Sequence, residues 1–167
     1  GKRNGGNPRA AAGQLNGAGI VSAGDAGGLD LKTLDFTGRR ILLAEDNAIN
    51  TEVAVMLLQD RGFSVDTAQN GEQALQTYQA SALNYYDAIL MDIRMPVMDG
   101  LAATRCIRES DHSDSKTVPI VAMTANVFEE DVKKSFDAGM NAHLSKPVDI
   151  KQMYAVLDEL VTGDGLL

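Results

Sequence analysis

The sequence predicts an α/β domain built on a parallel sheet with helices on both faces. From Arg39 onward, short apolar runs alternate with amphipathic windows five times, which is the pattern of successive strand–helix units. The runs stop at acidic or other polar residues, as strands buried on both faces do. Residues 39–167, which are 129 of the 167, are also numerous enough to bury a core.

Five runs of apolar and β-branched residues, bounded by charged or turn-forming residues, are the expected strands. In chain order they are residues 41–44, 63–68, 88–91, 118–123 and 142–145. Pro119 limits the fourth run at its start, because proline has no N–H to donate to a neighbouring strand.

The expected helices have recognisable starts and stops. Asn47 and Asp149 are N-cap residues for the first and last helices, and the Asn70-Gly71 turn opens the second. Gly62 and Gly139 end the first and fourth helices, and the third is expected over residues 100–108. The apolar residues at helical spacing, grouped by helix, are Ile49, Val53, Met56 and Leu57; Ala74, Leu75 and Tyr78; Val132 and Phe136; and Ile150, Met153, Leu157 and Val161.

The two ends of the chain differ from this domain in composition. Residues 1–38 hold ten of the sixteen glycines and show no helical or strand period, which is typical of a flexible linker. Leu34 and Phe36 form an apolar pair that could anchor the chain just before the first strand. We therefore expect a linker over residues 1–38, a domain over residues 39–162 and a C-terminal tail over residues 163–167.

Charge and composition exclude several classes of protein. The longest apolar run, residues 53–58, is far shorter than the roughly 20 residues needed to cross a bilayer, and no signal-peptide pattern is present. The net charge of −8 lacks the basic footprint of non-specific nucleic-acid binding. A single cysteine, Cys106, fits a reducing compartment. We expect a cytoplasmic segment that contacts neither nucleic acid nor membrane.

Polar residues follow four of the five expected strands. Glu45 and Asp46 follow the first strand, Asp92 ends the third, Thr124 follows the fourth and Lys146 follows the fifth. The carboxyl ends of parallel strands lie at one edge of the sheet, where ligands bind in this architecture. If the first and third strands are neighbours, these side chains meet in one crevice.

Three carboxylates and one lysine in a crevice carry an excess of negative charge. Two like charges about 4 Å apart repel by roughly 4 kcal/mol at an effective dielectric constant near 20, so the carboxylates should shift their pKa values or bind a cation. An all-oxygen site suits Mg²⁺ better than zinc. With Mg²⁺ and Lys146 neutralising phosphoryl oxygens, a carboxylate could attack phosphorus and form an acyl phosphate, which Thr124 would help to hold.

Other polar residues have simpler explanations. Glu45-Asp46, taken alone, also suits the acidic N-terminus of a helix, and Asp99-Gly100 suits a turn and helix start. Cys106 is expected to pack rather than to react, because no base is placed beside it. His112 lies in a polar loop, where we expect it to be solvated.

Four segments, taken together, resemble the response-regulator receiver domain. They are residues 41–47 (ILLAEDN), 91–100 (MDIRMPVMDG), 123–125 (MTA) and 144–147 (LSKP). They stand in the order of that family, and the resemblance covers about residues 39–162. It implies a flavodoxin-like, doubly wound sheet of five parallel strands in the order 2-1-3-4-5 with five helices.

The resemblance also implies a role for each residue at the strand ends. Asp92 is the implied phosphoacceptor and also a metal ligand, Asp46 is a direct Mg²⁺ ligand, and Glu45 is a ligand through water. The backbone carbonyl of Arg94 completes the protein's share of the metal shell. Lys146 pairs with the phosphoryl group, positioned by a cis Lys146–Pro147 bond.

Further positions are implied to switch or tune the domain. Thr124 is the switch hydroxyl that moves toward the phosphoryl group. His143 stands where many members of the family have Tyr or Phe, a departure in which an imidazole would fill a similar slot. Arg94 and Asn126 occupy the variable positions that tune the rate of dephosphorylation.

The implied function is that of a phosphoacceptor receiver in a two-component phosphorelay. A histidine kinase, expected in the same polypeptide, supplies the phosphoryl group from phosphohistidine, and a histidine phosphotransfer protein receives it. Residues 45–50 and 141–149 look like receivers attached to hybrid sensor histidine kinases, whose parent chain can carry a membrane anchor. The isolated domain would have at most self-phosphorylation and autodephosphorylation activity, while the parent would be a kinase.

Three alternatives stay open at this point. A stand-alone, single-domain response regulator would share all the motifs. A Mg²⁺-dependent phosphohydrolase of the haloacid-dehalogenase type also uses an aspartyl nucleophile, but the second acid that it needs is here Arg94, which cannot act as a general acid. A flavin or nucleotide binder would need glycines after the first strand, where this chain has acids.

Overall fold

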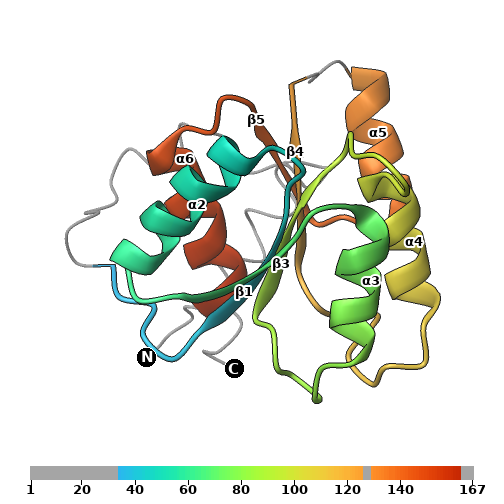
Figure 1. Ribbon diagram of the computed structural model, residues 1–167, viewed down its shortest axis with the longest axis horizontal. Helices are drawn as coiled ribbons and strands as arrows, with labels where there is room; N and C mark the ends of the chain where they lie inside the picture. The colour runs from blue at the N-terminus through green and yellow to red at the C-terminus, as the bar shows by residue number, and fades with distance from the viewer. Residues whose placement is uncertain (1–33, 126–128, 163–167) are drawn as a thin grey trace, which may run out of the picture.

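The computed structural model describes residues 34–125 and 129–162 (Figure 1). Five parallel strands form one sheet in the order β2-β1-β3-β4-β5, which confirms the predicted topology. The strands are β1 (Arg40–Ala44), β2 (Ser64–Ala68), β3 (Ala88–Asp92), β4 (Ile120–Thr124) and β5 (Ala142–Ser145). The chain passes from β1 outward to β2 and then back across β1 to β3. The strand order therefore reverses between β1 and β3, where open α/β sheets bind ligands.

Helices cover both faces of the sheet. They are α2 (Ala48–Asp60), α3 (Gly71–Gln79), α4 (Gly100–Glu109), α5 (Glu129–Ala138) and α6 (Ile150–Leu157), which continues into a π-helical turn, η4 (Asp158–Thr162). Figure 1 shows α2 and α6 on one face and α3, α4 and α5 on the other. None of the helices among the described residues is long and apolar enough to span a membrane.

The predicted N-cap residues are confirmed. The side chain of Asn47 accepts a hydrogen bond from the Asn50 N–H at the start of α2, and Asp149 accepts one from Lys151 N–H at the start of α6. These bonds satisfy backbone donors that a helix leaves unpaired in its first turn.

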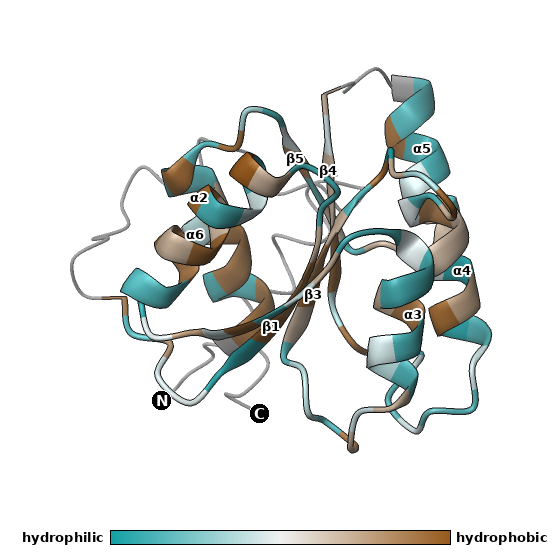
Figure 2. Ribbon diagram, in the orientation of Figure 1, coloured by the Kyte–Doolittle hydropathy of each residue, from teal (hydrophilic) through white to brown (hydrophobic). Residues whose placement is uncertain are grey.

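The core consists of two layers, one on each face of the sheet. Along β1, Ile41 and Leu43 enter the layer beneath α2 and α6, whereas Leu42 and Ala44 enter the layer beneath α3 and α4. Figure 2 shows hydrophobic residues concentrated along the central strands. Because these strands are buried on both faces, they are continuous apolar runs in the sequence.

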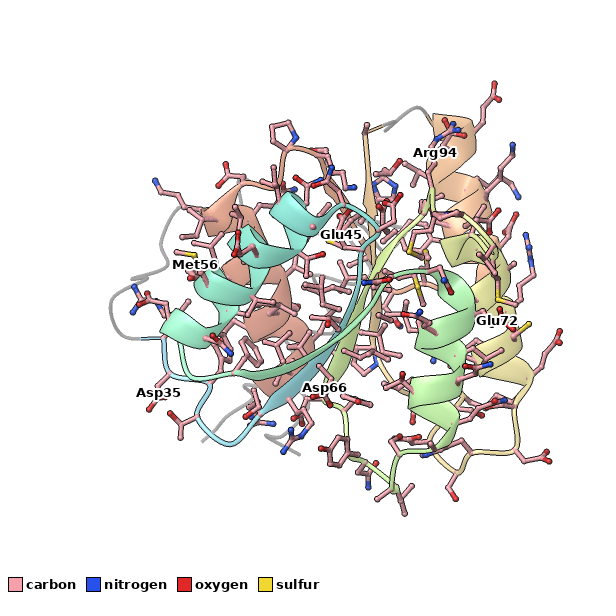
Figure 3. The ribbon with its side chains drawn as sticks, in the orientation of Figure 1. Asp35, Glu45, Met56, Asp66, Glu72 and Arg94 are labelled. Carbon is pink, nitrogen blue, oxygen red and sulfur yellow. The ribbon has the colours of Figure 1, made fainter. Side chains whose placement is uncertain are left out.

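The buried face of α2 is not the one that the residue spacing suggests. Ile49, Val53 and Met56 are 71%, 51% and 66% exposed, and the helix packs through Leu58 together with partly buried residues that include Leu57. Apolar residues occur on nearly every side of this helix, so its periodicity fits more than one face. The sheet covers one of them and leaves the stripe of Ile49, Val53 and Met56 in solvent, with Met56 on the outer side of α2 (Figure 3).

The packed domain begins earlier than the predicted boundary at residue 39. Phe36 is 1% exposed and its ring stacks on that of Phe63, with centroids 4.4 Å apart. The Phe36 N–H also donates to the Arg61 carbonyl at 2.7 Å. The predicted apolar anchor is thus confirmed, and residues 34–38, which we assigned to the linker, belong to the domain. Residues 1–33 and the predicted tail, 163–167, lie outside the described residues.

The expectation that His112 is solvated is wrong. Its side chain is 9% exposed, its Nδ1 atom lies 2.6 Å from Oδ1 of Asp114, and its ring packs on that of Tyr78. Tyr78, on α3, is distant from His112 in the sequence, and although Asp114 lies only two residues after His112, the sequence shows no more than a polar loop between α4 and β4. The loop folds inward, and there the side chains of His112 and Asp114 contact each other and the side chain of Tyr78.

Candidate functional site

The predicted site residues lie at the carboxyl ends of the strands. In the parallel register Ala44 pairs with Met91, Asp92 with Met123, and Thr124 with Ser145. This register brings the residues at the ends of β1, β3, β4 and β5 to one edge of the sheet. Figure 3 shows Glu45 and Arg94 near this edge, while Asp35 and Asp66 lie toward the opposite end.

Lys146 joins two of the three predicted carboxylates. Its Nζ atom donates to Oδ2 of Asp92 at 2.9 Å and lies 3.0 Å from Oε1 of Glu45. Asp92 and Glu45 are 3% and 4% exposed. The Lys146–Pro147 peptide bond is cis, as the resemblance implied.

One ammonium group does not compensate this much buried negative charge. Burial above all, with the charge of Glu45 acting in the same direction, raises the pKa of Asp92 to about 6, although the hydrogen bond from Lys146 opposes the shift. Burial acts to lower the pKa of Lys146, but its hydrogen bonds to Asp92 and Glu45 outweigh burial and hold it above the ordinary value. Binding of a further cation or of a proton would therefore stabilise the buried Asp92 carboxyl group.

The three acids form a cluster that can hold a metal ion. One carboxylate oxygen from each of Glu45, Asp46 and Asp92 lies within 4.8 Å of the others. Asp46 is exposed while the other two are buried, so the cluster has a solvent-facing side. It opens into a cleft of about 260 Å³ lined by Glu45, Asp46, Asn47, Asn50, Asp92, Arg94, Thr124, Ala125 and Lys146.

The loop after β3 is held tightly against the phosphoacceptor position. The Arg94 N–H donates to Oδ1 of Asp92 at 3.3 Å, and Gly100 N–H donates to the Ile93 carbonyl at 2.8 Å. A Cβ atom on Gly100 would lie 2.2 Å from the Asp92 carbonyl oxygen, so only glycine fits there. Asp99 caps α4 by accepting from the Ala102 N–H at 2.8 Å, which agrees with its predicted structural role.

Of the residues predicted to switch or tune the domain, His143 does not line the cleft. His143 lies on β5 at 4% exposure; burial lowers its pKa, and Asp131 on α5 opposes that shift. Asn126 lies outside the described residues. Thr124, by contrast, lines the cleft beside Asp92, as predicted.

The first turn of α2 contributes residues to the site that the sequence reasoning did not assign. The Asn47 N–H donates to Oε2 of Glu45 at 3.1 Å, and Asn50 lines the cleft. Asn47 is visible in the sequence as a helix cap. Nothing in the sequence pattern shows that the same turn also fixes the orientation of the Glu45 carboxylate.

Comparison with known proteins places this site in a family. The family model of the response regulator receiver domain matches residues 41–158. The chain belongs to the response regulator receiver family. Receivers are domains of two-component phosphorelays, so the predicted family and function class are confirmed, and neither the phosphohydrolase nor the flavin-binding alternative is favoured.

Relatives of this receiver include hybrid histidine kinases. Hybrid signal transduction histidine kinase I of Dictyostelium discoideum is 36% identical over 135 residues, which are 80% of this chain and 8% of the kinase. Histidine kinase 1 of Arabidopsis thaliana is 32% identical over 160 residues, which are 78% of this chain and 13% of that protein. The chain thus spans a small part of the length of these relatives.

Solved structures of receivers have the same fold. The receiver domain of sensor histidine kinase PA1611 from Pseudomonas aeruginosa PAO1, which has a magnesium ion in its active site cleft, is 38% identical with a TM-score of 0.68, over 75% of this chain and 99% of that one. The Saccharomyces cerevisiae complex of histidine phosphotransfer protein Ypd1 with the receiver of Ssk1 matches at 27% identity and a TM-score of 0.70, over 79% of this chain and 94% of that one.

Proposed function

We propose that this receiver accepts a phosphoryl group from phosphohistidine onto Asp92 in the presence of Mg²⁺. The observation that carries the proposal is the buried pair of Asp92 and Glu45 bridged by the single cation Lys146, beside the exposed carboxylate of Asp46. Mg²⁺ fits this donor set, because it prefers carboxylate oxygens and keeps several water ligands on its open side. Glu45, Asp46, Asp92 and the carbonyl of Arg94 are the groups that would hold it.

The residues of the cleft divide the work of the transfer. A bound Mg²⁺ would neutralise charge on the phosphoryl oxygens and keep Asp92 ionised. Asp92 supplies the attacking oxygen, and Lys146 stabilises the negative charge on the opposite side of the phosphoryl group. Thr124, which lines the same cleft, supplies a hydroxyl to the phosphoryl group after transfer.

Treatment with acetyl phosphate and Mg²⁺, followed by mass spectrometry, tests the phosphoacceptor. Wild type should gain one phosphoryl group, and Asp92→Asn, which preserves the shape of the side chain, should gain none. Chelation of Mg²⁺ should abolish labelling of the wild type. Equal labelling of wild type and Asp92→Asn would exclude Asp92 as the acceptor.

Thr124 and His143 are the residues we assign to the conformational switch. They lie on the neighbouring strands β4 and β5. His143 is on the side of the sheet that α5 covers, where Asp131 acts on it. Movement of Thr124 toward a phosphoryl group leaves space that the buried His143 ring can enter, and this shifts a pre-existing equilibrium at α5. Arg94 and Asn126 would tune the lifetime of the phosphoryl group. An unchanged NMR spectrum of β5 and α5 on phosphorylation would contradict the switch.

The exposed stripe on α2 is the surface that we assign to the protein partners. Ile49, Val53 and Met56 recur at intervals of four and three residues, so they form one face of the helix beside the cleft. Next to them lies a groove of about 480 Å³ lined on one side by Val53, Ala54 and Leu57 of α2. A histidine phosphotransfer protein is the proposed occupant, because it must bring a histidine to Asp92 and because the Ssk1 receiver forms a complex with such a protein.

Substitution of this stripe should separate docking from chemistry. Ile49→Ser with Met56→Ser should slow phosphotransfer from a phosphorylated histidine phosphotransfer protein at least tenfold, while acetyl phosphate labelling stays unchanged. Leu83→Ser is the matched control, because Leu83 is 58% exposed but lies in the loop before β3, at the far end of the sheet. Equal effects of the two variants would refute the assignment of α2.

We further propose that the parent protein is a hybrid sensor histidine kinase whose receiver faces the cytoplasm. The kinase relatives support this origin, and the kinase of the same chain would then be the phosphodonor. The parent open reading frame tests it. A kinase core upstream of residue 1 supports the hybrid, whereas a start codon near residue 30 supports a stand-alone response regulator.

A further inference from the structure

Asn50 lies where the acidic cleft meets the apolar groove beside α2. The two hollows share four lining residues, Glu45, Asn50, Ala125 and Lys146. Glu45 and Lys146 are paired with each other, and Ala125 has no polar side chain. Among the described residues that line both hollows, Asn50 is therefore the one whose polar side chain has no protein hydrogen bond.

The position of Asn50 is fixed relative to the metal-binding carboxylates. Oε2 of Glu45 accepts from the Asn47 N–H at 3.1 Å, and Oδ1 of Asn47 accepts from the Asn50 N–H at 2.9 Å. Two hydrogen bonds thus connect the backbone of Asn50 to the acid cluster. The backbone of Asn50 is thus held at the rim of the cleft, and its exposed carboxamide can meet a group that enters above Asp92.

The phosphodonor brings a specific group to this rim. When Asp92 attacks phosphohistidine, an O–P bond forms and the P–N bond breaks, and the electron pair of the P–N bond returns to the ring nitrogen. The other ring nitrogen keeps its proton, so the ring leaves as neutral imidazole. That remaining N–H needs an acceptor outside the phosphoryl group, because the two nitrogens lie on different sides of the ring.

We propose that Asn50 is a specificity-determining residue that recognises the imidazole of the incoming phosphohistidine. Its carboxamide oxygen accepts a hydrogen bond from the ring N–H and thereby favours the protonated, better leaving group. A carboxamide suits this task better than a carboxylate, because it adds no further negative charge beside Glu45, Asp46 and Asp92. The inference rests on the proposed function and names the residue that selects the class of phosphodonor.

Three phosphodonors separate this role from the alternatives. Phosphorylation rates of Asp92 are measured with a phosphorylated histidine phosphotransfer protein, with phosphoimidazole and with acetyl phosphate, all with Mg²⁺. Asn50→Ala should slow transfer from the first two donors about tenfold, which is the loss of one transition-state hydrogen bond. Acetyl phosphate has no ring N–H, so its rate should change less than twofold.

The neighbouring variant Ile49→Ala is the matched control, and it should slow the protein donor alone. Equal slowing of acetyl phosphate and phosphoimidazole by Asn50→Ala would show that Asn50 acts on the phosphoryl group or the metal, and would overturn the proposal. Slowing of the protein donor alone would make Asn50 a docking residue and overturn it as well. If wild type takes phosphate from none of the three donors, the proposed function fails, which is distinct from these outcomes.

Discussion

Asp92 and Asp114 are two of the three buried carboxylates among the described residues, the third being Glu45, and their surroundings are opposite in kind. Asp92, 3% exposed at the carboxyl ends of the strands, faces a second buried carboxylate and shares one lysine with it. Asp114, 7% exposed in the loop before β4, lies at the amino ends. It accepts hydrogen bonds from the Tyr78 hydroxyl and the Asn84 N–H and contacts the His112 ring.

The difference distinguishes a reactive acid from a structural one. Burial first, and then the bond to Asp114, raise the pKa of Tyr78, so that its hydroxyl remains a donor. Both carboxylate oxygens of Asp114 have protein partners, so binding of a ligand there would add no stabilising interaction. Asp92 shares a single lysine with Glu45, so the pair has too little positive charge beside it, and a metal ion would supply that charge. Burial of a carboxylate therefore does not by itself indicate a functional site, whereas burial without enough compensating positive charge does.

Removal of Asp114 should have the largest effect on stability. Asp114→Ala removes the partner of the Tyr78 hydroxyl, of the His112 Nδ1 atom and of the Asn84 N–H, and should lower the free energy of unfolding by about 3 kcal/mol. Urea denaturation measures the loss. Labelling of Asp92 by acetyl phosphate should persist under native conditions, and its abolition in a folded variant would show that the two ends of the sheet are coupled.

Tyr78→Phe should have the next largest effect. It removes one hydroxyl and leaves Asp114 with its other partners, so the expected loss is about 1.5 kcal/mol. Tyr85→Phe is the matched control, because Tyr85 is 39% exposed and should lose less than about 0.5 kcal/mol. Equal losses in the two variants would mean that the bond to Asp114 contributes no net stability.

Asp92→Asn should shift stability in the opposite direction. It removes one of two buried like charges, and the raised pKa of Asp92 reports the energetic cost of that charge. Allowing for screening by solvent, we expect the free energy of unfolding to rise by about 1 kcal/mol. A fall of similar size at pH 7.5 without Mg²⁺ would show that Asp92 is satisfied, as Asp114 is.

The same deficit predicts a dependence on pH. The pKa of Asp92 is about 6 in the fold and near 3.8 when unfolded, so the folded state binds the proton more tightly. Stability from this group is therefore present below about pH 4 and lost as the pH rises through 6. Thermal melts should show this step in wild type but not in Asp92→Asn. Mg²⁺ should raise the melting temperature of wild type more at pH 7.5 than at pH 5.

The fold was predictable because its decisive signals are local. Apolar runs that end at acids mark strands buried on both faces, and Asn47 and Asp149 mark helix starts. The orientation of α2 was not predictable from its own residues. Met56 and Leu58 are equally apolar, and only contact with the sheet decides that Leu58 is buried. Phe36 was assigned to the linker because its partner, Phe63, is distant in sequence.

The site was predictable to the extent that parallel strands bring their ends together. Asp92, Thr124 and Lys146 follow from that rule and from the family resemblance. Asn50 does not, because its importance depends on which side of α2 faces the cleft. The burial of His112 was not predicted for a related reason. A polar loop is expected to be solvated, and only the folded structure shows that His112 contacts Asp114 and Tyr78.

The last predictions concern two residues whose φ angles lie in the left-handed region, where only one of them has a suitable side chain. Val97, in the loop after β3, has a φ of 70° and is 76% exposed, and the Met98 N–H bonds to the Pro96 carbonyl around it. A β-branched residue is strained there, whereas asparagine tolerates this region. Asn84, beside Asp114, has a φ of 57° and is already asparagine.

Reciprocal substitutions test whether strain is confined to the phosphorylation end of the sheet. Val97→Asn should raise the free energy of unfolding by about 0.5–1 kcal/mol, and Asn84→Val should lower it by about 1 kcal/mol or more. Urea denaturation measures both. If Val97→Asn also leaves phosphotransfer unchanged, the strain has no part in the reaction. If it stabilises the domain but slows transfer from the protein donor, the exposed valine in the loop after β3 is retained for contact with the partner, at the expense of stability.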